Sequence, residues 1–111
     1  RNTVKSMYMD EKIEQYILDI VFATREPEKY NLSEIKSYIS YGGSPRASIS
    51  LAMASRAYAF LQHRAYVIPD DIKAVVKDVL RHRIGLTFEA EAEQISTELI
   101  IDKIIQRIDV P

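Results

Sequence analysis

The sequence predicts an all-α fold, a bundle of four or five helices with short connections and no sheet. Apolar residues recur at helical spacing in several stretches of the 111-residue chain. Residues that favour helix, among them Ala, Glu, Lys and Arg, are plentiful, whereas Gly occurs only 3 times. Capping residues or prolines stand before several of the apolar stretches, where helices begin.

The first expected helix begins after Asp10, which can cap it, and ends before Pro27, because the residue before a proline is steered away from helix. Its spacing predicts a buried stripe of Ile13, Tyr16, Ile17, Ile20 and Val21, with Thr24 at its edge. A short helix capped by Ser33 is expected next, with one face formed by Ile35, Tyr38 and Ile39. Gly42 and Gly43 would end that helix.

The next helix is expected over residues 45 to about 63. Its many alanines would let other helices approach closely, so we take it as the central helix of the bundle. The following helix begins at Pro69, with Asp70 and Asp71 in a first turn where acids suit the helix dipole. Ile68 occupies its cap position, so this start lacks the usual Ser or Thr. The predicted buried stripe is Ile72, Val75, Val76, Val79 and Leu80.

The last part of the chain predicts one more helix. Residues 84–88 alternate apolar with small or polar side chains and are expected to be extended, and residues 89–94 are expected to form an acidic connector. Ser96 can cap the final helix, whose apolar stripe is Ile100, Ile101, Ile104, Ile105 and Ile108.

Composition limits the class of protein. A chain of 111 residues is long enough for one domain with a buried core. The formal net charge of −1 argues against a nucleic-acid-binding module, which usually carries a basic excess. No apolar run approaches the ~18 residues of a membrane span, and cysteine is absent. We therefore expect a cytoplasmic protein with no membrane span and no nucleic-acid partner. The chain starts at Arg1 rather than Met, which suggests a piece of a longer protein.

No self-contained catalytic or metal site is predicted. The P-loop pattern GxxxxGK[ST] is absent. His63 and His82 are 19 positions apart and have no cysteine partner, so no metal site is expected. The Arg81-His82-Arg83 run could bind an anion or an acidic partner surface, or it could be a solvated helix end.

The most unusual stretch is the start of the central helix. Ser44 is a good N-cap, and Pro45 suits the first helical position. Arg46 follows in the first turn, where the helix dipole favours acids over cations. A guanidinium there makes electrostatic sense if an anion such as phosphate binds beside it. The alternative is that Arg46 pairs with a nearby carboxylate or points to water.

Four ordered stretches resemble the C-terminal helical lid of a MoxR-type AAA+ ATPase. They are Tyr16-Ile17 leading to Ala23-Thr24-Arg25, then residues 41–47, 66–72 and 79–84. The most specific is Tyr41-Gly42-Gly43-Ser44-Pro45-Arg46-Ala47, although the family usually has Ala at position 43 and Thr at position 68. The resemblance implies an all-α bundle of the AAA+ lid type over residues 9–111, and a linker from a missing ATPase core over residues 1–8.

The resemblance also implies functional residues. Arg46 matches the sensor-2 arginine, which reaches the γ-phosphate of ATP held with Mg by the preceding core domain. Such an arginine is the residue with a catalytic role in the lid. Ser44, Pro45 and Ile17 match positions that lie against the adenine in similar lids. The chain by itself, lacking Walker motifs, would be inactive.

The partners follow from the same resemblance. They are the upstream AAA+ core domain, neighbouring subunits of a hexamer, and client proteins, some with von Willebrand factor A domains, that the ATPase remodels or matures in a chaperone-like manner. Two alternatives stay open: a lid from another AAA+ branch, such as magnesium chelatase, and a free-standing helical module that binds protein or DNA.

Overall fold

The all-α prediction is confirmed by a computed structural model that describes residues 8–111. The molecule is elongated, with extents of 44 × 22 × 20 Å. The main helices are α2 (Glu11–Arg25), α3 (Pro45–Leu61), α4 (Pro69–Leu80) and α6 (Thr97–Arg107). Smaller elements are the 3-10 turns η1 (Pro27–Tyr30) and η2 (Ser33–Tyr38), the short helix α5 (Phe88–Ala92), and the strands β1 (Ile39–Tyr41) and β2 (Gly85–Leu86).

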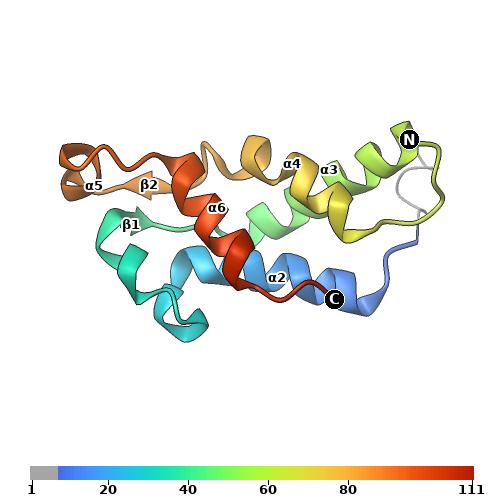
Figure 1. Cartoon of the computed structure of the whole chain (residues 1–111). Helices are drawn as coiled ribbons and strands as arrows, with labels where there is room; N and C mark the ends of the chain where they lie inside the picture. Colours follow the sequence, from blue (N-terminus) through green and yellow to red (C-terminus); the bar gives the residue numbers. More distant parts are fainter. Residues whose placement is uncertain (1–7) are drawn as a thin grey trace.

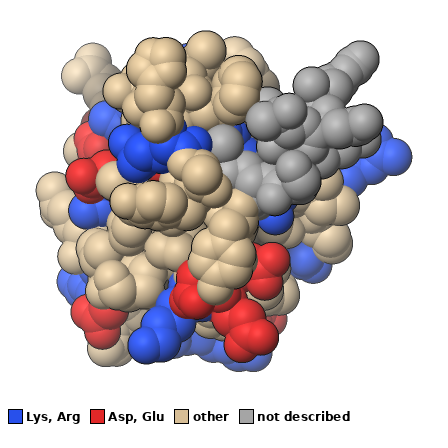
Figure 2. All heavy atoms as spheres, turned by 90° about the vertical axis from the view of Figure 1, so that its right-hand side faces the viewer, with Lys and Arg blue, Asp and Glu red and all other residues tan. Residues whose placement is uncertain are grey.

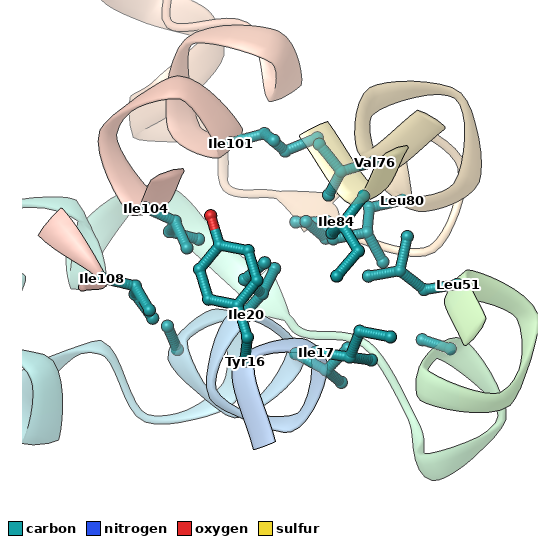
Figure 3. Packing of buried hydrophobic residues seen from close by; sticks show 14 of the residues in the cluster. Tyr16, Ile17, Ile20, Leu51, Val76, Leu80, Ile84, Ile101, Ile104 and Ile108 are labelled. Atoms are coloured by element: carbon teal, nitrogen blue, oxygen red, sulfur yellow. The ribbon is translucent and has the colours of Figure 1, made fainter. Parts of the chain in front are cut away.

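Helices α3 and α4 lie side by side, and α2 packs against α3 on the other side (Figure 1). Helix α6 crosses over and contacts both α2 and α4. The predicted apolar stripes meet in this space. Figure 3 shows side chains of α2, α3, α4 and α6 converging on one core, among them Tyr16, Ile20, Leu51, Leu80 and Ile104. These five residues are at most 2% exposed.

Three of the predicted helix caps are confirmed. Asp10 accepts a hydrogen bond from the Lys12 amide at 3.0 Å, and Ser96 accepts one from the Leu99 amide at 3.1 Å. Ser44 caps α3 in the same way. Ser33 is different: it is the first residue of the 3-10 turn η2, and no side chain caps that turn.

A small antiparallel sheet departs from the sequence prediction. Strand β1 pairs with β2, so Ile39 belongs to a strand instead of the predicted helix face. The Thr87 amide continues the pairing by donating to the carbonyl of Tyr38 at 3.0 Å. The extended conformation predicted near residues 84–88 is thus correct for β2, but its partner lies more than forty positions earlier in the chain. Local spacing carries no information about such a pairing.

The predicted acidic connector is also different in the structure, because most of it forms the helix α5. Thr87 caps this helix, its hydroxyl accepting from the Ala90 amide at 3.2 Å. Ala90 is fully buried and anchors the short helix to the rest of the molecule.

At the start of α4, Ile68 has no side chain that can cap the helix, and an acid in the first turn accepts a hydrogen bond there instead. The carboxylate of Asp71 accepts a hydrogen bond from the Ile68 amide at 2.9 Å. It also forms an ion pair with Arg64, and the Asp71 side chain is fully buried. Asp70 beside it is exposed. The presence of Ile68, where the family usually has threonine, therefore leaves the helix start intact, because Asp71 supplies the acceptor.

Charges of both signs are mixed on the face that Figure 2 displays, which is the right-hand end of Figure 1. Acidic and basic side chains lie near one another there without a continuous basic surface. None of the helices within residues 8–111 combines the length and apolar character that a membrane crossing requires. Of the predicted linker at residues 1–8, only Tyr8 lies within the described residues; its amide donates to the carbonyl of Ala65 at 3.3 Å.

Candidate functional site

The candidate site is the first turn of α3. The Ser44 hydroxyl accepts a hydrogen bond from the Arg46 amide at 3.2 Å, and Pro45 is the first helical residue. This first turn contains no acidic residue. Ser44, Pro45 and Arg46 are all exposed. The local geometry therefore places a guanidinium at the positive end of a 17-residue helix.

The side chain of Arg46 is unpaired within the described residues. Of the hydrogen bonds and ion pairs between residues 8 and 111, those of Arg46 involve its backbone only. The alternative in which a nearby carboxylate of this domain neutralises Arg46 is thus not found in this part of the chain. Its charge is available to an external anion, or to water.

The loop that presents Arg46 is held against the end of α2 by Thr24. The Gly43 amide donates to the Thr24 hydroxyl at 2.8 Å, and that hydroxyl donates to the Val21 carbonyl at 2.6 Å. Thr24 is fully buried. This connection could not be predicted from the sequence, since a threonine at the edge of an apolar stripe gives no sign of its distant partner.

Both glycines in the loop make close contacts. A Cβ on Gly42 would lie 2.3 Å from the carbonyl oxygen of Thr24, so no larger residue fits without moving the backbone. A Cβ on Gly43 would lie 3.0 Å from the Cβ of Ala47. That contact is tight but can be relieved by a small shift, so the alanine typical of the family is compatible with this loop.

A groove between α2 and α3 leads to the candidate site. Its larger part has a volume of about 340 Å³ and is lined by residues that include Ile17, Ile49, Met53 and Arg56. A smaller hollow of about 110 Å³ lies next to it and includes Arg25 and Pro45 in its lining. Leu18 and Ser48 line both. The structure thus places Ile17 and Pro45 in the linings of two neighbouring hollows, although Ile17 is only 2% exposed.

The Arg81-His82-Arg83 run is partly engaged inside the domain. Arg81 pairs with Asp78 at 3.1 Å and also with Glu98 of α6. Arg81 donates hydrogen bonds to Glu98 and to Asp78, and these bonds, the one to Glu98 first, raise the pKa of Arg81. The same bond from Arg81 lowers the pKa of Glu98. Arg83 donates to the Ser50 hydroxyl at 3.0 Å. The first arginine of the run therefore joins α4 to α6.

No cluster of three or more His, Asp or Glu side chains suited to a metal ion occurs among residues 8–111. The site thus consists of one unpaired arginine at a helix start, with an apolar groove beside it. This arrangement can hold an anion and an apolar or flat group.

Comparison with known proteins gives the class of this domain. The AAA lid domain family matches residues 32–104, more than half of the chain. The chain therefore belongs to the AAA lid domain family. A solved structure of an ATPase candidate from Cytophaga hutchinsonii superposes with a TM-score of 0.96 at 46% identity, over 99% of this chain and 33% of that one.

Curated relatives narrow the class to lids of the MoxR type. The chain is 44% identical to Chaperone MoxR1 of Mycobacterium tuberculosis, over 86% of this chain and 26% of that protein. It is 34% identical to Protein MoxR of Paracoccus denitrificans, over 89% of this chain and 31% of that protein. The predicted resemblance is confirmed, and the chain spans only about a quarter to a third of these relatives' length.

Proposed function

We propose that this chain is the nucleotide-sensing lid of a MoxR-type AAA+ ATPase and supplies Arg46 as the sensor-2 arginine to ATP bound in the core domain. One observation carries the proposal. Arg46 stands exposed at the start of α3 with no acidic partner among the described residues. A cation at the positive end of a helix is repelled by the helix dipole. The arrangement becomes favourable when an anion binds to both the cation and the helix N-terminus.

The residues around Arg46 fit a nucleotide in part. The guanidinium and the helix dipole suit a phosphate group. The small hollow beside Pro45 has an apolar lining from Leu18, Val21 and Phe22, which suits one face of an adenine. The Ser44 hydroxyl already accepts the capping hydrogen bond from the Arg46 amide. Ser44 would therefore touch the nucleotide by van der Waals contact. Mg would be held by groups of the core domain.

The arginine would act by electrostatics. As charge moves between the phosphates during transfer, a fixed guanidinium stabilises it, and arginines in such positions are worth about 10³-fold or more in rate. The lid would also respond to the nucleotide, since ATP and ADP offer Arg46 different contacts and thus favour different lid positions. The rigid connection through Thr24 would pass that movement to α2.

The rest of the proposal concerns the longer parent protein. It would assemble into hexamers in the cytoplasm and use Mg-ATP to remodel or mature client proteins, some with von Willebrand factor A domains. Support comes from the relatives, one of which is named a chaperone. The MoxR names favour this function over a chelatase lid or a free-standing module.

The decisive experiment measures ATP turnover by the full-length parent protein with Arg46→Ala. We expect kcat to fall by about 10³-fold while the protein stays folded, because the Arg46 side chain is exposed and forms no hydrogen bond or ion pair among residues 8–111. Arg46→Lys should recover only part of the rate, since a lysine lacks the planar fork of donors.

Lys73→Ala is the matched control, because Lys73 is an exposed cation on α4. That variant should keep its turnover within about twofold. Unchanged turnover in Arg46→Ala would refute the phosphate role, and an equal loss in Lys73→Ala would show that general loss of positive charge is responsible.

A further inference from the structure

The loop that leads to Arg46 is short and has one hydrogen-bonded attachment to α2. Strand β1 ends at Tyr41 and α3 begins at Pro45, so residues 42–44 make the whole connection. Within residues 8–111, the one hydrogen bond from this loop to an element other than α3 is that from the Gly43 amide to the Thr24 hydroxyl. The place of the loop on α2 therefore depends on the side chain of Thr24.

Burial makes this hydroxyl difficult to replace. Thr24 is fully buried and Gly43 is buried as well. The Thr24 carbonyl lies directly under Gly42, so the loop rests on this one residue at two points, its hydroxyl and its backbone. A buried amide that loses its acceptor is unfavourable, and the loop would shift until another acceptor or water reached it.

The same turn of α2 forms the hollow beside Pro45. The Val21 carbonyl accepts the hydrogen bond from the Thr24 hydroxyl at 2.6 Å, and Val21 lines that hollow together with Pro45. The hydroxyl of Thr24 is thus bonded both to the loop before Arg46 and to the turn that lines the hollow. Loss of the hydroxyl would change the position of Arg46 relative to the hollow.

We propose that Thr24 is a positioning residue for Arg46: its hydroxyl fixes the start of α3 against α2, so that the guanidinium and the apolar hollow act on the same nucleotide. This role rests on the proposed function, because it requires a nucleotide bound by Arg46. Thr24 is fully buried and touches no nucleotide itself. It can still control turnover, since a displacement of about 1 Å at a reacting group can cost about 10²-fold in rate.

The test measures ATP turnover by the full-length parent protein with Thr24→Val, which keeps the shape of the side chain and removes the hydroxyl. We expect kcat to fall by at least about tenfold. KM should change by less than about threefold, because the core domain would hold most of the nucleotide. Thr24→Ser restores the hydroxyl and should keep about a third or more of the original kcat.

Thr87→Val is the matched control, because the Thr87 hydroxyl makes the same pair of hydrogen bonds at the start of α5. It accepts from the Ala90 amide at 3.2 Å and donates to the Ser37 carbonyl at 2.8 Å. This variant should lose stability and leave kcat unchanged. Thermal unfolding shows whether each variant is folded. If Thr24→Val is not, Thr24→Cys takes its place, since a thiol is only a weak acceptor.

A double variant separates positioning from a general loss of structure. In a protein that already carries Arg46→Ala, Thr24→Val should change kcat by less than about twofold, because no guanidinium is left to position. The same fall in both backgrounds would mean that Thr24 acts only through the stability of the fold, and would overturn the proposal. So would a kcat within twofold of the original in Thr24→Val alone.

Hydrogen exchange of the Gly43 amide gives a readout that does not depend on turnover. In the full-length protein, this amide should exchange at least about tenfold faster in Thr24→Val, because it has lost its acceptor. An unchanged exchange rate would overturn the proposal.

The two roles can fail separately. If Arg46→Ala slows turnover and Thr24→Val does not, the phosphate role stands and the positioning role fails. If Arg46→Ala leaves turnover unchanged, the phosphate role fails, and the exchange rate of the Gly43 amide alone decides whether Thr24 fixes the loop.

Discussion

The amide of Gly43 donates a hydrogen bond to the buried hydroxyl of Thr24 at 2.8 Å, and this bond joins the end of α2 to the loop that presents Arg46. The same hydroxyl donates to the Val21 carbonyl, so both of its hydrogen-bonding functions are used. Arg46 is therefore exposed in its side chain but fixed in its backbone. An arginine that senses a phosphate needs this combination, because a mobile loop would lose entropy at each binding event.

The contact between Gly42 and Thr24 predicts different effects for two adjacent glycines. Gly42→Ala should lower the free energy of unfolding by about 1–3 kcal/mol, because the new methyl group meets the Thr24 carbonyl. Gly43→Ala should change it by less than about 1 kcal/mol, since the tight contact with Ala47 is offset by a less flexible unfolded chain. Chemical denaturation of both variants measures this. Equal losses would contradict the close packing of Gly42.

The adjacent acids at the start of α4 should also differ. Asp71→Ala should cost about 3 kcal/mol of stability, because it leaves Arg64 and the Ile68 amide without their buried acceptor. Asp70→Ala is the control and should cost only about 0.3–1 kcal/mol, the usual value for an exposed acid in a first turn. Urea denaturation at neutral pH provides both numbers. A similar cost for the two variants would mean that the Asp71–Arg64 pair is not formed in solution.

Tyr16 predicts a substitution that preserves or improves stability. Its hydroxyl is buried in the core without a hydrogen-bond partner among the described residues, and burial raises its pKa. Tyr16→Phe removes this unsatisfied group and should leave the free energy of unfolding unchanged or raise it by up to about 1 kcal/mol. Tyr30→Phe, which loses a 3.3 Å hydrogen bond to Asp19, should lower it slightly. A loss above about 1 kcal/mol in Tyr16→Phe would reveal a partner for the hydroxyl.

The Arg81–Glu98 pair between α4 and α6 predicts a pH dependence. The pKa of Glu98 is lowered in the folded state, chiefly by the hydrogen bond from Arg81, so protonation of Glu98 favours unfolding. Its stabilising effect is complete above the unfolded pKa of about 4.3 and is lost as the pH falls through the lower folded pKa. The Glu98→Gln variant should therefore have a lower melting temperature than the original protein at pH 7, and the difference in melting temperature should become smaller at acidic pH. Glu91→Gln, an exposed residue on α5, should show no such gap.

The local sequence was enough to predict the four main helices, α2, α3, α4 and α6, and most of their starts. Helical spacing and caps depend on residues three or four positions apart, so Asp10, Ser44 and Ser96 could be assigned as caps from the sequence alone. The same reasoning singled out Arg46, because the preference of a first turn for acids is also a local property. Its role toward a phosphate stays a prediction that follows from the resemblance.

Contacts between distant segments were decided only by the tertiary structure. The pairing of β1 with β2, the bond from Gly43 to Thr24, and the burial of Asp71 beside Arg64 all join residues that no local period relates. Asp70 and Asp71 look alike in the sequence, yet one faces water and the other is enclosed by the packing of α3 on α4. Burial is a property of the assembled bundle, because it depends on which helix covers which face. The groove that exposes Ile49 and Met53 arises from the same packing.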